Sequence, residues 1–152
     1  MNKPAVFLRI AAGLTFIHAV LHTIGGVFGR IDPGAATIAV QAMKTNQFLL
    51  LGHVRSFWDF YRGLGLGVTI SLTAESIVFW QLASLAKTNA RCLRPILITF
   101  AFAYSIYAVN SYAYFFFGPV ITEILIAASL GMAIVTAKSR SEADQGTPLR
   151  AA

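Results

Sequence analysis

The sequence predicts an all-α integral membrane protein, a four-helix bundle with a long extracytoplasmic first loop. The 152 residues are 57% hydrophobic and only 12% charged, with a mean hydropathy of +0.68. That composition is too apolar for an ordinary soluble domain of this length. Four apolar segments also reach the roughly 20 residues that span a hydrocarbon core. We place them at residues 5–28, 64–85, 95–114 and 119–137.

The first segment has a basic start, as a signal peptide does. Its apolar run is longer than a signal-peptide core and ends in IGGVFGR, without an A-x-A-like cleavage site. We therefore expect a retained helix. The single cysteine, Cys92, leaves no pair for an intramolecular disulfide within this sequence and is expected to be a packing residue.

The second segment carries interfacial aromatics and closely spaced glycines. Trp58 and Trp80 flank it at a helical separation of roughly 33 Å, which matches the spacing of two aromatic belts. Gly63 and Gly67 form a G-x-x-x-G pair, which predicts close approach by another helix of the bundle or of a second copy.

Residues 29–57 form a connection longer than two neighbouring helices require. Within it, DPGAATIAVQAMKTN predicts a short surface helix, whereas FLLLGHV is too short to span a membrane. We expect this excursion to cap the bundle on the extracytoplasmic side.

The third and fourth segments are joined by YFFFGPV, where Gly118 permits a tight reversal and Pro119 suits the first turn of a new helix. They are predicted to form an antiparallel hairpin. Residues 1–138 then make one membrane domain. Residues 139–152 are polar, lack aromatics and are predicted to be a disordered cytoplasmic tail.

Basic residues predict the orientation. The side shared by the N-terminus, the second loop and the tail carries Lys3, Arg9, Lys87, Arg91, Arg94, Lys138, Arg140 and Arg150. The opposite side carries only Arg30, Lys44, Arg55 and Arg62. The positive-inside rule therefore places both termini in the cytoplasm, for a multi-pass protein of a bacterial inner (plasma) membrane. The net charge of +6 indicates topology rather than nucleic-acid binding, because the basic residues do not form one stripe.

Polar residues in or beside the apolar segments are the candidate site, since each is costly in a bilayer and usually faces the bundle interior. Counted inward from the outer helix ends, several share the extracytoplasmic half. Arg55, Asp59 and Arg62 also follow i, i+4, i+7 spacing, which fits either a ligand site or an interfacial salt-bridge ladder. The candidate ligand-binding residues are His18, His22, Arg55, Asp59, Arg62, Asn110 and Glu123.

His18 and His22 project from the same helix face, about 6 Å apart along the axis. Both rings could reach one zinc-sized ion with a third ligand such as Glu123, Asp59 or His53. The spacing argues against both rings binding one haem, although one histidine could pair with a histidine of another subunit. The cofactor therefore stays unknown.

Two other roles remain open for the histidines. His22 and Glu123 have matching depths, so they are candidate catalytic groups for proton transfer. The rings could instead hydrogen-bond to neighbouring helices as packing elements. Deeper in the bundle, Glu75 is expected to form a structural ion pair with Arg9.

The stretches FLRIAAGLTFIHAVLHTIGG, RSFWDFYRGLGLGVTI and AVNSYAYFFFGPVITEILIA together resemble an uncharacterised family of small bacterial four-helix membrane proteins. More distantly, LRIAAGLTFIHAVLHTIGG is similar to the first helix of DoxX-like proteins. That resemblance implies a four-helix fold and an association with redox or quinone-linked systems. A sterol-isomerase-like bundle is a further analogy, through its use of histidine and glutamate.

Three functions follow from these patterns. The leading hypothesis is a protein, or an accessory subunit of a membrane complex, that binds a lipophilic ligand such as a quinone or lipid in a polar extracytoplasmic cavity. The second is a membrane isomerase or oxidoreductase with His22 and Glu123 as acid and base. The third is a metal- or haem-binding protein using His18, His22 and Glu123. Expected partners are membrane lipid, a lipophilic small molecule and a further copy of the chain, without nucleic acid.

Overall fold

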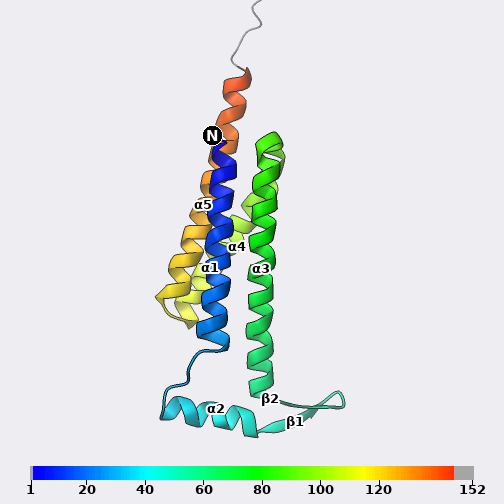
Figure 1. Cartoon of the computed structure of the whole chain (residues 1–152), viewed down its shortest axis with the longest axis vertical. Coiled ribbons are helices and arrows are strands. Elements are labelled where there is room, and N and C mark those ends of the chain that lie inside the picture. Colours follow the sequence, from blue (N-terminus) through cyan, green and yellow to red (C-terminus); the bar gives the residue numbers. More distant parts are fainter. Residues whose placement is uncertain (1, 146–152) are drawn as a thin grey trace, which may run out of the picture. The chain divides into compact units, whose positions relative to one another are not determined.

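The computed structural model describes the backbone of residues 2–145 and the side chains of residues 2–137. The elements run α1 (Lys3–Leu21), the π-helix η1 (His22–Val27), α2 (Ala35–Thr45), β1 (Gln47–Leu50), β2 (His53–Ser56), α3 (Phe57–Asn89), the short 3₁₀ turn η2 (Arg91–Leu93), α4 (Arg94–Tyr114) and α5 (Phe117–Gln145) (Figure 1).

Among the described residues, four helical segments are long and apolar enough to cross a membrane. They are Lys3–Val27, Phe57–Asn89, Arg91–Tyr114 and Phe117–Ala137. The prediction of four such helices is therefore confirmed in length and composition.

The chain divides into two compact units. The four-helix unit consists of Met1–His18 and Ala74–Ala152, and the hairpin unit consists of Ala19–Thr73. Helices α1 and α3 each contribute one part to each unit.

The core of the four-helix unit joins all four of its helices. Large side chains meet alanines, whose small size allows close approach of the helix backbones. On α5 the buried positions recur at i, i+4 and i+7, which describes one helix face. The central residues are Leu8, Ala11, Ala12, Phe79, Ala83, Leu97, Tyr104, Ile126, Leu130 and Ala133.

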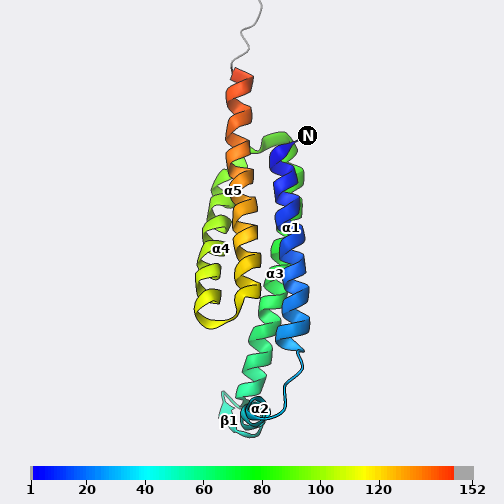
Figure 2. The ribbon, with the colours of Figure 1, turned by 90° about the vertical axis from the view of Figure 1, so that its left-hand side faces the viewer.

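Helices α4 and α5 lie side by side as the predicted antiparallel hairpin (Figure 2). The reversal falls earlier than expected, between Tyr114 and Phe117, because α5 already begins at Phe117. Gly118 lies in the first turn of α5, where a methyl group would stand 2.7 Å from Cε2 of Phe116. Glycine there lets the phenylalanine ring lie close to the helix, and a methyl group would push this exposed ring aside.

Helix α5 extends into the segment predicted to be the tail. It continues to Gln145, past the expected start of disorder at Ser139. The segment SRSEADQ contains no Gly or Pro and can extend a helix, and the helix-breaking residues Gly146 and Pro148 come only after it. The remainder of the predicted tail, residues 146–152, lies outside the described residues.

The hairpin unit contains the excursion between the first two long helices. The predicted surface helix is present as α2, while the following residues form an antiparallel hairpin that the sequence did not indicate. In its register Phe48 faces Arg55, Leu49 faces Val54 and Leu50 faces His53. Both α2 and the hairpin run across the axis of the first half of α3 (Figures 1 and 2).

Helix α3 begins at Phe57, well before the predicted residue 64. A reciprocal cap fixes this start. The backbone N–H and hydroxyl of Ser56 donate to Oδ2 of Asp59 at 2.8 and 2.9 Å, and the N–H of Asp59 donates back to Oγ of Ser56 at 3.2 Å. The hydropathy of the segment did not show this start because Asp59 and Arg62 lie in its first turns.

Candidate functional site

Glu123 is the predicted site residue that the four-helix unit buries most completely, with only 7% of its surface exposed. It lies in the second turn of α5, where the α4–α5 hairpin brings Ser111 opposite it. The Ser111 hydroxyl donates to Oε1 of Glu123 at 3.0 Å. Oε2 is buried and has no hydrogen-bond partner among the described residues. Ser111 therefore holds one carboxyl oxygen, whereas the other, called the open oxygen below, is buried and lacks a hydrogen-bond partner among the described residues.

A second, half-buried carboxyl is contacted from the same face of α4. The hydroxyl of Tyr104, which is fully buried, donates to Oε2 of Glu75 at 2.6 Å. Tyr104 and Ser111 are seven residues apart, which places them on one helix face about 10.5 Å apart along the axis. One face of α4 thus presents a hydroxyl to a carboxyl of α3 and another to a carboxyl of α5.

Glu75 does not have the partner that the sequence predicted. Arg9, its expected ion-pair partner, instead places its guanidinium over the Trp80 ring, 5.2 Å from the centroid. The Arg9 side chain is exposed and snorkels along the outside of the helix, whereas Glu75 turns inward to Tyr104. Although Arg9 and Glu75 lie at similar depths along α1 and α3, their side chains point in different directions.

His22 belongs to the hairpin unit, at the first position of η1. Its Nε2 lies 3.1 Å from the carbonyl oxygen of Gly65 on α3. Because a carbonyl only accepts, this bond requires the proton on Nε2. A methyl group at Gly26 would stand 3.3 Å from Nδ1, so glycine leaves room for the ring. While this bond holds, Nε2 is neither a free base nor a metal ligand.

The other histidine and the amide of the predicted site lie in the four-helix unit. His18 is half-buried on α1, and Asn110 is exposed on α4. His18 and Glu123 therefore belong to one compact unit and His22 to the other. No group of three His, Cys, Asp or Glu side chains that could hold a metal ion occurs among the described residues, so the metal alternative gains no support.

The stripe of Arg55, Asp59 and Arg62 resolves into three separate contacts. Arg55 is exposed, and its Nη1 donates to the carbonyl oxygen of Val54 at 2.8 Å. Asp59 closes the cap of α3. Arg62 lies over two rings, 4.6 Å from the centroid of Phe28 and 5.9 Å from that of Trp58. These contacts anchor the start of α3, as cation–π pairs at a helix end do.

Close helix approach occurs at Gly65, not at the predicted Gly63 and Gly67. A methyl group at Gly65 would stand 3.0 Å from Cγ2 of Val27, whereas added methyl groups at Gly63 and Gly67 would meet nothing within 4 Å. The G-x-x-x-G pair therefore has no packing role within the hairpin unit. The glycine between its two members supplies the contact.

Sequence reasoning missed Ser111 because serine in an apolar helix usually bonds to its own backbone. Several hydroxyls of this protein do so, among them those of Ser105 and Ser129. The available signal was the combination of a serine near the end of one helix and a glutamate near the start of the next, since an antiparallel hairpin brings those positions to one depth.

A scan against family models gives no match to this chain, and searches of the curated proteins and of the solved structures give no significant match. Function is therefore inferred from the chain's own contacts.

Proposed function

We propose that this is an integral membrane protein that binds a lipophilic ligand with a polar head, such as a quinone or a lipid, at the open oxygen of Glu123. As a carboxylate, Glu123 accepts a hydrogen bond from a quinol hydroxyl or a lipid head group. As a carboxylic acid, it donates one to a quinone carbonyl. Ser111 holds the other oxygen and so orients the carboxyl.

The open oxygen of Glu123 carries this proposal. A buried polar atom without a partner costs about 1–3 kcal/mol, and native proteins leave few of them. In hydrocarbon no water is at hand to satisfy it. Glu75, also a carboxylate of the four-helix unit, has a tyrosine hydroxyl on its Oε2. A ligand supplying a partner to Glu123 removes the cost at the one carboxyl where it persists among the described residues.

The distribution of lysine and arginine supports the proposed location, a bacterial inner membrane with both termini in the cytoplasm. In this orientation the α4–α5 turn and Glu123 face the extracytoplasmic side. The distant DoxX-like resemblance of the first helix is compatible with a quinone ligand, and a role as an accessory subunit or homo-oligomer belongs to the same proposal.

Native mass spectrometry of protein extracted gently from its membrane tests the ligand proposal. We expect wild type to retain a small molecule near one per chain, and Glu123→Leu to lose it at least tenfold. Glu75→Gln is the matched control, because it alters a carboxyl that already has a partner, and it should keep the molecule. An empty wild type, or equal retention by Glu123→Leu, would contradict the proposal.

In the acid–base alternative the basic atom of His22 is Nδ1, because Nε2 donates to the Gly65 carbonyl. This alternative makes a separate prediction. Turnover of a retained compound that is abolished by both His22→Ala and Glu123→Gln, with folding intact, would favour an enzyme over a binding protein.

A further inference from the structure

The β1–β2 hairpin exposes an apolar tip. Leu51 is 93% exposed, Leu49 is 72% exposed and Val54 is 57% exposed. Leu49 and Val54 are directly opposite in the register, so they share one face of the hairpin. The opposite face packs through the Phe48 ring on two phenylalanine rings of α3, with centroids 5.1 and 5.9 Å away. Burial of Leu49, Leu51 and Val54 therefore requires a partner outside the chain.

The conformation of the turn strengthens this point. Leu51 and Gly52 both have positive φ, 49° and 81°. A two-residue turn of this kind favours Asn-Gly, because asparagine tolerates positive φ better than most residues. Leucine is less favourable there, and at 93% exposure it gains almost no packing within the chain. Its stabilising contact must come from elsewhere.

The hairpin is joined directly to a helix that could span a membrane. Strand β2 ends at Ser56 and α3 begins at Phe57, with no residue between them. Trp58 and Tyr61 stack in the first turns of α3, with ring centroids 5.3 Å apart, and such residues favour the membrane interface. Because α2 and the hairpin run across the axis of α3 (Figure 1), they lie along the bilayer surface if α3 crosses it.

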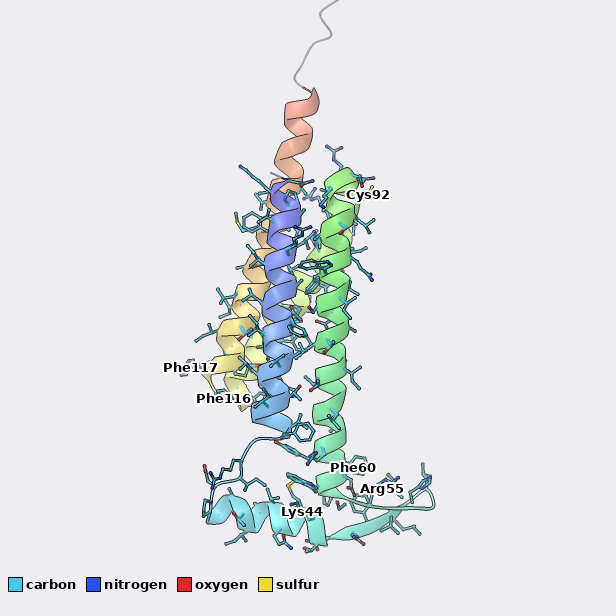
Figure 3. The ribbon with its side chains drawn as sticks, viewed as in Figure 1. Lys44, Arg55, Phe60, Cys92, Phe116 and Phe117 are labelled. Atoms are coloured by element: carbon cyan, nitrogen blue, oxygen red, sulfur yellow. The ribbon has the colours of Figure 1, made fainter. Side chains whose placement is uncertain are left out.

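The charge at the base of the hairpin, where Arg55 lies opposite Phe48, indicates which kind of surface the tip would meet. Residues 47–56 contain Arg55 and His53 but no carboxylate. Lys44, in the last turn of α2, lies over Trp58 with its Nζ 4.9 Å from the ring centroid. Figure 3 shows Lys44, Arg55 and Phe60 around the start of α3. The neighbouring Asp59 accepts hydrogen bonds from Ser56 and keeps its negative charge, which Lys44 and Arg55 together outweigh. This combination of an exposed apolar tip and an excess of positive charge at its base matches anionic lipid, which attracts lysine and arginine.

We propose that the hairpin and α2 dock onto anionic lipid of the leaflet at which α3 begins. Leu49, Leu51 and Val54 enter the boundary between head groups and acyl chains, and Lys44 and Arg55 contact lipid phosphates. This inference rests on the proposed membrane insertion of α3, but it does not require a ligand at Glu123.

An environment-sensitive fluorophore tests it on the full chain in single-copy nanodiscs. Cys92→Ser supplies a cysteine-free background, in which Leu51→Cys carries the label and Val54→Cys provides a second position on the same hairpin. We expect blue-shifted emission that brominated lipid quenches severalfold. A label at Thr88→Cys, at the exposed end of α3, should give water-like emission. A label at Ile70→Cys, within α3, reports insertion.

Three results would overturn the inference. The first is water-like emission at both hairpin positions while Ile70→Cys is quenched, which would leave the membrane proposal intact. The second is shielding of the hairpin labels from iodide without quenching by brominated lipid, which would indicate a protein contact instead. The third is equal quenching in neutral and anionic discs. We expect stronger quenching in anionic discs, and loss of that difference in the Lys44→Gln, Arg55→Gln double variant.

Discussion

The four-helix unit and the hairpin unit are built on different principles. In the four-helix unit, large side chains such as Phe79 and Leu130 are fully buried, and hydroxyls of α4 meet carboxyls from α3 and α5. In the hairpin unit most side chains are exposed, and the contacts include cations over rings, stacked rings and hydrogen bonds to backbone carbonyls. Helix packing holds the first unit together, whereas the second depends on helix-end contacts and on its surroundings.

The largest test of this difference removes a ring from the packed core. Phe79→Ala deletes a fully buried ring that meets Phe100 edge-on at 5.0 Å, and should cost about 3–5 kcal/mol in the free energy of unfolding. Phe102→Ala removes an exposed ring and should change it by no more than about 0.5 kcal/mol. Both values come from unfolding titrations in bicelles. A small effect of Phe79→Ala would show that the unit is not packed as described.

The next test removes one hydroxyl. Tyr104→Phe keeps the ring but leaves Oε2 of Glu75 without its donor, at an expected cost of about 1–3 kcal/mol. Tyr112→Phe, at an exposed position of the same helix, should be nearly neutral. The same titrations compare the two. Equal stabilities would indicate that another group satisfies Glu75.

A smaller effect is expected at the start of α3. Ser56→Ala removes the reciprocal cap with Asp59 and should destabilise the protein by about 1 kcal/mol. Ser56→Thr keeps a capping hydroxyl and should recover most of the loss. Hydrogen exchange of the first turn of α3 localises the change, and an unchanged exchange rate in Ser56→Ala would refute the cap's role.

The smallest expected effects are at two glycines of α3, where the same substitution to alanine should change the free energy of unfolding in opposite directions. Gly63→Ala should stabilise the protein by roughly 0.5–1 kcal/mol, since a methyl group there meets nothing and alanine favours a helix. Gly65→Ala presses a methyl group to 3.0 Å from Val27 and should instead destabilise it by about 1 kcal/mol. The opposite order would place the helix contact at Gly63 after all.

The long helices could be predicted because their apolar length is that of a segment able to span a membrane, and α2 could be predicted from its local pattern. The hairpin could not, because FLLLGHV lacks alternation and its Leu-Gly turn is not a preferred one. In the structure residues 49–54 of this apolar run are exposed and do not contribute to a core.

The candidate site was predicted less well, because depth along a helix does not specify direction around it. His22 and Glu123 matched in depth, yet the ring of His22 bonds to Gly65, 43 positions further along the chain, within the hairpin unit. Likewise, Arg9 turns to Trp80 while Glu75 turns to Tyr104. Only the tertiary structure shows that Glu123 has one open oxygen.

The central claim is that helix packing stabilises the four-helix unit, whereas lipid stabilises the hairpin unit. Its most direct test is amide hydrogen exchange, measured once in neutral detergent and once in nanodiscs with anionic lipid. The account predicts that the amides of residues 79–86 and 126–133 exchange equally slowly in both media, because helix packing protects them. The amides of β1 and β2 should exchange at least tenfold more slowly in the nanodiscs. Hairpin exchange that is the same in both media would contradict the account.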